Sequence, residues 1–461
     1  MKEFNEGNPV QAFVSLDNNL YFHDVLKDKT IQVTNDGVNE KIFNGIADWV
    51  YEEEIFMKSK AFEWSPDGKY LAFYKFDDSD PGHPNPYVSL HVYSLEKQTL
   101  SQIDLDKIYK KENRIVNELV WIDSERFVVR VLNRIQNESK LILIDVRKLE
   151  DLLLISSKIY EIDGWIDSNG KLKTFKTKDG KIFLLDLNNY KNYNRVYLID
   201  VTQSSIDHSP ILLSANENDF KYFAAAKPSA TNLNLFASSL DGKELTQVTS
   251  GDSYYTASFN PTLDYYFLHY EGPKIPKTYL KKMNDPDNKD FEENIKGVKL
   301  PSVDYIQIPS GKLMLNVKVL YPPGFNATLK NYYPVFIQVY NGPSSQMVTK
   351  EYSRFEYGTH LASAEDIIVA YVDGRGTANR GKEFKMSVYK KLGKYESEDQ
   401  IAAAKWFSEL PFVRKSCIAI QGWSYGGFVA AKVIEANSPY VRIGVSVAPV
   451  TNWKFYGNEK S

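Results

Sequence analysis

Short β-rich runs recur along the first two thirds of the chain, and turn sequences separate them. The runs are LYFHDV (20–25), YLAFYKF (70–76), SLHVYSL (89–95), RFVVRVL (126–132), LILIDV (141–146), VYLIDV (196–201), NLFASSL (234–240) and YYFLHY (265–270). Ser-Pro-Asp-Gly at 65–68 and Asp-Gly at 179–180 and 241–242 are typical of tight turns between strands. The runs form a loose repeat of about 40–50 residues with four strands each, as in propeller blades. The pattern predicts a β-propeller, with a series of unrelated β-sandwiches as the alternative.

The pattern changes near residue 300, where apolar runs begin to alternate with helical segments. Strands are expected at 303–309, 313–321, 333–340, 366–373 and 441–449, and a helix is expected at 396–410. The runs YPVFIQVY and DIIVAYVD are almost continuously apolar, as in parallel strands that are covered on both faces. This alternation predicts a doubly wound α/β sheet. We therefore expect a propeller domain over 1–296 and an α/β domain over 297–461.

Composition narrows the possible partners and compartments. The formal net charge is −3 at pH 7 and no long basic run occurs, so nucleic acid is not expected as a partner. No run of 18 or more apolar residues occurs, and the first residues lack the apolar core of a signal peptide. Cys417 is the only cysteine, which rules out an intrachain disulfide. Two glycosylation sequons, at Asn137 and Asn326, fall within what chance gives in a chain of this length.

A nucleophile elbow is the strongest chemical signal in the sequence. Gly422-Trp423-Ser424-Tyr425-Gly426 matches G-x-S-x-G. A buried strand is expected before the motif and an alanine-rich helix after it, and small residues let the two backbones approach closely around a strained serine. The helix N-terminus beneath Ser424 favours developing negative charge. The segment predicts a catalytic serine in an α/β-hydrolase domain; a tight turn that holds an ordinary helix-capping serine is the alternative.

A serine nucleophile needs a base and an orienting carboxylate, which in this fold follow the serine in the order Asp or Glu, then His. Neither His nor Asp occurs after Ser424 in the 461 residues. The six histidines all precede it, and we expect them to be surface or core residues: His23, His83, His91, His208, His269 and His360. The chain as given therefore lacks two members of a triad.

The segment DWVYEEEIF (48–56) resembles the dipeptidyl peptidase IV branch of the prolyl oligopeptidase family, and the fungal dipeptidyl aminopeptidases look closest. The resemblance covers nearly the whole chain. It implies that the segment projects from the propeller and that Glu53 and Glu54 bind the α-amino group of a peptide substrate. A pair of carboxylates holds an ammonium group by charge-assisted hydrogen bonds. Such an anchor at a fixed distance from the serine would release only dipeptides. Without the resemblance, a glutamate run is usually a solvated face.

Other segments match the same branch. Tyr340, in VYNGP, resembles the tyrosine whose hydroxyl donates to the oxyanion, and the backbone N–H of Tyr425 would be the second donor. The turn Asp373-Gly374-Arg375-Gly376 and the helix start containing Glu398-Asp399-Gln400 also match, as structural features. The resemblance further implies that Tyr425, Val450, Trp453 and Tyr456 line an S1 pocket for a proline ring or a small alanine. Plain core packing is the alternative for these aromatic residues.

The chain also departs from the family pattern. The membrane anchor, the first blades and an arginine near the substrate carbonyl are expected before its start, a propeller loop is expected near residues 80–84, and the catalytic Asp and His are expected after its end. The expected fold is thus an incomplete all-β propeller followed by a truncated α/β-hydrolase domain with a mostly parallel sheet. A gene-model error, a pseudogene and a real fragment would all explain these departures.

The resemblance implies a serine dipeptidyl peptidase that removes X-Pro or X-Ala from peptides with a free N-terminus, without a metal or an organic cofactor. The intact protein would be a type II protein of the secretory pathway, at the vacuolar membrane in a fungus, and a possible homodimer. Two alternatives remain: an inactive fragment or a non-catalytic propeller and hydrolase scaffold, and another serine esterase or endopeptidase. The glutamate pair argues against an endopeptidase, because internal peptide bonds present no free amine.

Overall fold

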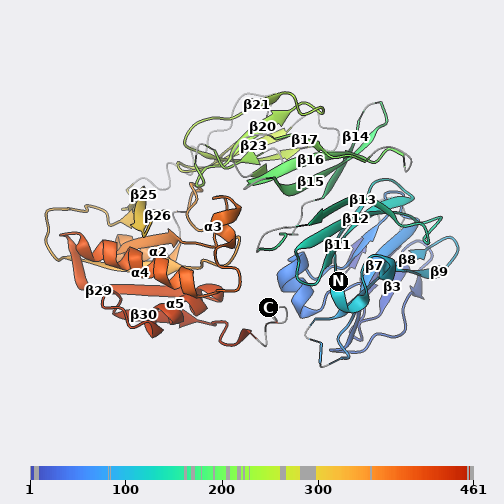
Figure 1. Cartoon of the computed structure of the whole chain (residues 1–461), viewed down its shortest axis with the longest axis horizontal. Helices are drawn as coiled ribbons and strands as arrows, with labels where there is room; N and C mark the ends of the chain where they lie inside the picture. The colour runs from blue at the N-terminus through green and yellow to red at the C-terminus, as the bar shows by residue number, and fades with distance from the viewer. Residues whose placement is uncertain are drawn as a thin grey trace. The chain divides into compact units, whose positions relative to one another are not determined.

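The structure is a computed structural model of the 461-residue chain (Figure 1). It describes residues 2–4, 10–80, 82–83, 85–159, 164–167, 172–177, 179–190, 193–203, 208–214, 220–221, 224–227, 229–259, 266–280, 297–353, 356–453 and 456. The chain divides into two compact units, one of residues 1–187, 197–212 and 452–461, and the other of residues 188–196 and 213–451.

The first unit contains antiparallel sheets built from strands that are neighbours in the sequence. The first sheet has the order β1 (Lys2–Phe4), β2 (Val10–Val14), β3 (Leu20–Asp24), β4 (Lys29–Gln32). The second has the order β5 (Ile42–Asn44), β7 (Tyr70–Asp77), β8 (Tyr87–Ser94), β9 (Thr99–Ile103), and β6 (Phe62–Trp64) pairs with β7. The third has the order β10 (Arg114–Trp121), β11 (Arg126–Asn133), β12 (Glu138–Asp145), β13 (Leu153–Ile159). Up-and-down sheets of this kind are propeller blades.

Three further antiparallel sheets follow among the described residues. The strands are β14 (Lys173–Lys176), β15 (Ile182–Tyr190), β16 (Tyr193–Asp200) and β17 (Ile211–Leu212); then β18 (Phe220–Lys221), β19 (Ala224–Ala225), β20 (Asn234–Ser238) and β21 (Leu245–Gln247); then β22 (Tyr254–Phe259), β23 (Tyr266–Gly272) and β24 (Lys277–Leu280). The first of these sheets has strands in both compact units, and the other two belong to the second unit. Each predicted β-rich run overlaps a strand among the described residues, although several runs extend one or two residues past the strand ends.

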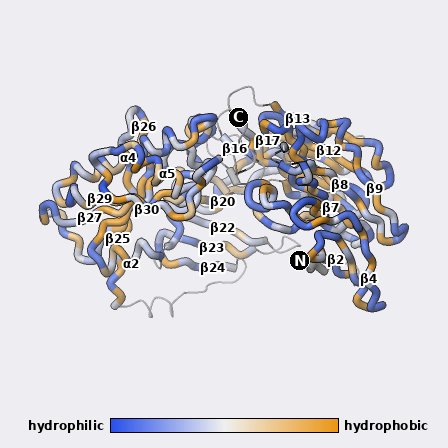
Figure 2. The backbone as a smooth tube through the Cα atoms, turned by 90° about the horizontal axis from the view of Figure 1, so that it is seen from below, coloured by the Kyte–Doolittle hydropathy of each residue, from blue (hydrophilic) through white to orange (hydrophobic). Residues whose placement is uncertain are grey.

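The second unit also holds a mixed sheet of the order β25 (Ser302–Ser310), β26 (Leu313–Tyr321), β28 (Ile368–Asp373), β27 (Tyr333–Val339), β29 (Val413–Trp423), β30 (Ile443–Val447). The pairs β27–β28, β27–β29 and β29–β30 are parallel, and the β25–β26 hairpin is antiparallel. Every residue of β28 is buried, as its apolar run predicts. Figure 2 shows hydrophobic residues concentrated along β27 and β29.

Helices connect the strands of this mixed sheet. They are α2 (Tyr357–Ala364), α3 (Lys382–Met386), α4 (Lys394–Glu409) and α5 (Tyr425–Glu435). The helices α4 and α5 pack against each other and against β29 (Figure 1). Gly393 allows this packing, because its φ of 80° begins α4 and a Cβ there would lie 2.5 Å from the Phe428 ring.

The sheets bear out the expected fold class, blades followed by a doubly wound α/β-hydrolase domain. The expected boundary after residue 296 falls next to residues outside the described ranges, and it stays a prediction. No helix among the described residues is long and apolar enough to cross a membrane.

Candidate active site

Ser424 sits in a strained turn between a buried strand and a helix. It directly follows β29 and directly precedes α5, with φ of 56° and ψ of −118°. A non-glycine residue rarely adopts this conformation, and such strain is typical of functional turns. The Ser424 N–H donates to the carbonyl of Val447 on β30 at 3.0 Å, and the Ser424 carbonyl accepts from the Phe428 N–H at 3.0 Å. The turn is thus tied to the neighbouring strand and to the first turn of α5.

Three glycines make the turn sterically possible. A Cβ on Gly422 would lie 2.0 Å from the Gly426 carbonyl oxygen. A Cβ on Gly426 would lie 2.1 Å from the Val339 carbonyl oxygen, and one on Gly427 would lie 2.7 Å from that of Val447. Distances this short exclude any side chain without backbone movement. Because these glycines have no side chains, the serine turn lies in close contact with the ends of β27 and β30.

The same close approach places the two expected oxyanion donors beside the serine turn. Tyr340 follows the last residue of β27, and its Cα would lie only 2.9 Å from a Cβ on Gly426. The Tyr340 ring is 38% exposed and lies 6.2 Å from the ring of Tyr425, between centroids. Tyr425 is the first residue of α5, where backbone N–H groups point out of the helix end.

The side chain of Tyr425 points into the protein interior. Its ring is 7% exposed and packs edge-on against Phe428. Its hydroxyl donates a 2.6 Å hydrogen bond to Glu396 of α4, which is fully buried. Burial raises the pKa of Glu396, the hydrogen bond from Tyr425 opposes the rise, and the charge of Asp399 adds to it. The phenol therefore anchors the residue that follows the nucleophile.

All six histidines lie in the described residues, and His269 and His360 belong to the same compact unit as Ser424. His91 is buried beside Ser89, and burial lowers its pKa to about 4. His269 bonds to Thr278 on the adjacent strand. His360 is exposed on α2. Among the described residues of this unit, neither His269 nor His360 is hydrogen-bonded to Ser424.

The glutamate segment forms a short π-helix, η1 (Tyr51–Phe56). The Asp48 carboxylate accepts from the N–H groups of Val50 at 3.0 Å and Tyr51 at 3.3 Å, which fixes the start of the turn. Tyr51 and Ile55 are buried, and the Tyr51 hydroxyl accepts from the Val116 N–H of β10 at 3.2 Å. Because the buried residues are four apart, the intervening glutamates face outward.

Glu53 and Glu54 are both exposed on this turn. Desolvation raises the pKa of Glu54, a hydrogen bond with Tyr456 opposes the rise, and the charge of Glu53 adds to it. The Tyr456 ring also packs edge-on against Trp49, with centroids 5.3 Å apart. A cation bound beside Glu54 would favour its ionised form.

The expected S1 residues are only partly brought together within one unit. Trp453 and Tyr456 pack edge-on, with centroids 5.4 Å apart, and both are half-buried. Val450, also half-buried, belongs to the other compact unit, together with Tyr425. Their grouping in one pocket stays a prediction. Among the described residues, no three His, Cys, Asp or Glu side chains lie close enough to hold a metal ion.

Sequence reasoning did not identify Asn341, Glu396 and Asp399 as buried polar residues of this domain. Asn341 follows Tyr340 with φ of 61° and is 1% exposed, while the two acids are fully buried on α4. The sequence did contain a signal, since charged residues occupy the positions of α4 that continue the face of Ala403 and Phe407. A charge on the buried face of a helix calls for a specific partner.

A strained serine elbow on a doubly wound sheet, in a chain that also carries propeller blades, defines a serine hydrolase fold with an appended propeller. Comparison with known families agrees. The dipeptidyl peptidase IV N-terminal region matches residues 8–80 and 79–277, and the prolyl oligopeptidase family matches residues 353–461. The chain belongs to the prolyl oligopeptidase family, in its dipeptidyl peptidase IV branch.

Individual relatives point the same way. The chain is 31% identical over 510 residues to a probable dipeptidyl-aminopeptidase B of Arthroderma otae, covering 95% of the chain and 54% of that protein. It is 33% identical to the Arthroderma benhamiae protein of the same name, covering 95% and 55%. The chain therefore spans about half the length of these relatives. The crystal structure of Porphyromonas gingivalis dipeptidyl peptidase 4 matches with a TM-score of 0.85 at 27% identity, over 100% of the chain and 69% of that structure.

Proposed function

We propose that this chain belongs to a serine dipeptidyl peptidase that releases N-terminal dipeptides. The observation that carries the proposal is the Ser424 turn, whose backbone strain and glycine contacts serve a nucleophile better than a structural serine. Ser424 attacks the scissile carbonyl, and an acyl-enzyme forms that water then hydrolyses.

Two donors stabilise the tetrahedral intermediate in this proposal. They are the hydroxyl of Tyr340 and the backbone N–H of Tyr425. Support comes from the position of Tyr340 at the end of β27, in steric contact with the serine turn, and from the place of Tyr425 at the start of α5. Donors that are fixed before the reaction stabilise charge without having to reorganise.

Glu53 and Glu54 bind the substrate's α-ammonium group in this proposal. Support comes from their exposure on the turn between buried Tyr51 and Ile55, and from the charge of Glu53, which raises the pKa of Glu54 and which a bound cation would offset. An anchored amine limits the reaction to peptides with a free N-terminus.

The substrate preference, the oligomeric state and the location are proposed from the resemblance to the family. We propose that Tyr425, Val450, Trp453 and Tyr456 form an S1 pocket for proline or alanine, so that substrates are peptides with Pro or Ala at the second position. We further propose that the intact protein is a glycosylated homodimer at a vacuolar membrane. The sequon at Asn326 is exposed, whereas Asn137 is half-buried in the β11–β12 hairpin, so Asn326 is the better acceptor.

Analysis of the cleavage products distinguishes a dipeptidyl peptidase from an endopeptidase and from a non-catalytic scaffold. The full-length protein that contains this chain is incubated with a decapeptide that begins Gly-Pro, and the products are identified by mass spectrometry. Release of Gly-Pro and the matching octapeptide alone supports the dipeptidyl peptidase. Internal cleavage indicates an endopeptidase, and an intact peptide indicates the scaffold.

A further inference from the structure

Helix α4 buries polar side chains where an amphipathic helix would normally bury apolar ones. Glu396, Asp399 and Gln400 are each 0% exposed, and Ala403 and Phe407 continue the same face. Buried carboxylates and amides are costly unless specific partners satisfy them. The partners of these three residues therefore indicate what the face is for.

The hydrogen-bond partner of Glu396 is Tyr425. The Glu396 carboxylate receives the 2.6 Å hydrogen bond from the Tyr425 hydroxyl. The tyrosine is held at both ends, because its backbone forms the start of α5 and its phenol is fixed to α4. Any shift of the Tyr425 backbone N–H relative to Ser424 would have to stretch or rotate this charge-assisted bond.

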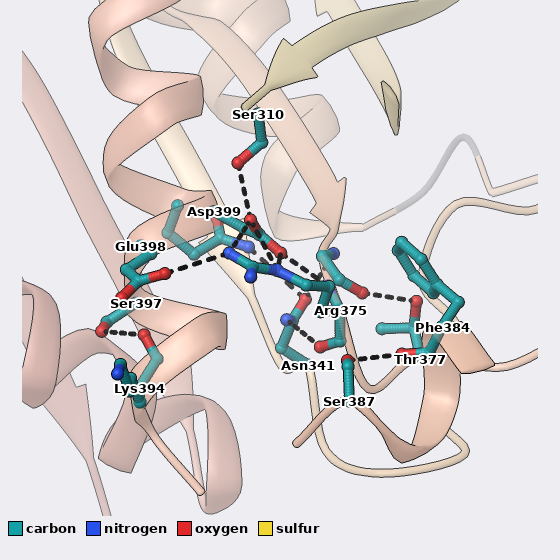
Figure 3. A network of polar contacts seen from close by, with 12 residues as sticks. Ser310, Asn341, Arg375, Thr377, Phe384, Ser387, Lys394, Ser397, Glu398 and Asp399 are labelled. Atoms are coloured by element: carbon teal, nitrogen blue, oxygen red, sulfur yellow. Dashed lines mark hydrogen bonds and ion pairs between the residues drawn. The ribbon is translucent and has the colours of Figure 1, made fainter. Parts of the chain in front are cut away.

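The partners of Asp399 connect it to Asn341, the residue after Tyr340, and Figure 3 shows Ser310, Arg375, Asn341 and Asp399 in this network. Asp399 accepts from the Arg375 N–H at 2.7 Å and from its guanidinium at 2.8 to 3.2 Å, and it also accepts from the Ser310 hydroxyl at 2.7 Å. This fixes the turn after β28. The carboxamide of Asn341 then accepts from the Gly374 N–H of that turn at 2.9 Å and donates to the Arg375 carbonyl at 3.3 Å.

Gln400 closes the network. Its amide donates to the Val372 carbonyl at 3.1 Å and to the Asn341 carboxamide oxygen at 3.4 Å. Asn341 is thereby held in its left-handed conformation, with φ of 61°. Because Asn341 directly follows Tyr340, these bonds also hold the peptide group that joins the two residues at the end of β27.

We propose that Glu396, Asp399 and Gln400 form a positioning platform on α4 that fixes both oxyanion donors against Ser424. The inference rests on the proposed function, since it assigns the platform to the donors named there. Both connections start within five residues of one helix, so a single rigid element aligns Tyr340 and Tyr425. Alignment of this kind affects turnover strongly, because a misplaced donor loses transition-state contact while substrate binding persists.

The test uses the full-length protein and Gly-Pro p-nitroanilide. Asn341→Gly keeps the left-handed backbone accessible and removes the carboxamide, and Asn341→Asp keeps the acceptor for Gly374. We expect kcat to fall about 10- to 100-fold in Asn341→Gly, with KM changed less than about 3-fold, and to recover in part in Asn341→Asp.

The Glu396 connection is tested by a double-mutant cycle of Glu396→Gln and Tyr425→Phe. If Glu396 acts through the phenol, each variant lowers kcat and the double variant is no worse than the more damaged single one. Glu409→Gln, the same change on the exposed surface of α4, is the matched control and should keep the parent kcat. Thermal unfolding of each variant shows how much folded protein contributes to the measured rate.

The outcomes distinguish the two proposals. If Ser424→Ala abolishes turnover but the folded Asn341→Gly and Glu396→Gln proteins keep the parent kcat, the platform is wrong and the proposed function stands. A purely structural role of Asn341 and Glu396 predicts that the folded variants keep the parent kcat but have a lowered Tm. If the parent shows no turnover that depends on Ser424, both proposals are overturned. A fall in kcat at constant KM in the folded variants supports the platform.

Discussion

The Tyr425 hydroxyl donates a 2.6 Å hydrogen bond to the fully buried carboxylate of Glu396, so the residue after the nucleophile is tied to a different helix by a bond inside the core. Burial raises the pKa of Glu396. Removing either partner would leave a buried polar group unsatisfied, which costs about 1–3 kcal/mol. This hydrogen bond therefore holds Tyr425 in place before a substrate binds.

The first prediction concerns Tyr340. In the full-length protein, Tyr340→Phe should lower kcat about 100- to 1000-fold on Gly-Pro p-nitroanilide, with a small change in KM, because the donor acts on charge that exists only in the transition state. Steady-state kinetics measure the two constants separately. A change confined to KM would place Tyr340 in substrate binding or packing instead.

The second prediction concerns the glutamate pair. Glu53→Ala and Glu54→Ala should each reduce kcat/KM about 30-fold or more, since an ammonium group bound without its carboxylate partner loses about 2–5 kcal/mol. The parent should also discriminate against N-acetyl-Gly-Pro p-nitroanilide. Glu52→Ala serves as the control on the same turn. Equal rates on the free and acetylated substrates would mean that the glutamates form only a solvated face.

The third prediction concerns the acid that starts the glutamate turn. Burial raises the pKa of Asp48 to about 7, and the charge of Asp78 adds to the rise. Between the ordinary pKa of 3.8 and about 7, the folded state keeps a proton that the unfolded state has released. Stability therefore falls as pH rises through this window, by at most about 1.4 kcal/mol per pH unit from Asp48.

Asp48→Asn tests this linkage, because asparagine keeps an acceptor for the Val50 and Tyr51 N–H groups without the charge. The free energy of unfolding, measured by urea titration from pH 4 to pH 8, should fall less steeply with pH in the variant. Asp78 is partly buried and has a pKa raised to about 6, so some slope should remain. Identical slopes in parent and variant would show that Asp48 ionises normally in the folded protein.

Much of the fold could be predicted from the period of the apolar positions. The run RFVVRVL predicted a strand that the structure places at Arg126–Asn133, and DIIVAYVD predicted the wholly buried β28. The π-helix over Tyr51–Phe56 could not be read from periodicity. It is set by the Asp48 cap and by the anchoring of Tyr51 and Ile55 in the blade core, which are tertiary contacts.

The part of the site that lies within a local sequence motif could be predicted. The G-x-S-x-G sequence located Ser424, because the strain and the close approaches all involve residues within the motif or next to it. The network around Asn341 was not predictable, since it joins residues from β25, the turn after β28 and α4 that lie up to 89 positions apart in the sequence. Only the fold brings these residues together.

The fourth prediction concerns residues 1–461 expressed alone. We expect no peptidase activity, because no imidazole follows Ser424 in this segment to take its proton, and the oxyanion donors alone give only about 10³- to 10⁴-fold over water. We also expect self-association, because Ile443 and Val445 on the edge strand β30 are 55% and 43% exposed. Turnover assays and sedimentation velocity test both expectations. A monodisperse, active protein would mean that an upstream histidine such as His360 serves as the base.

The central claim is that Ser424 is the nucleophile of a dipeptidyl peptidase. Its most direct measurement is the rate of Gly-Pro p-nitroanilide hydrolysis by the full-length protein and by its Ser424→Ala variant, with fluorophosphonate labelling followed by peptide mapping. We predict that the label maps to Ser424 and that the variant loses turnover by about a million-fold with an unchanged fold. A variant that keeps more than a hundredth of the parent rate, or a label on another residue, would contradict the claim.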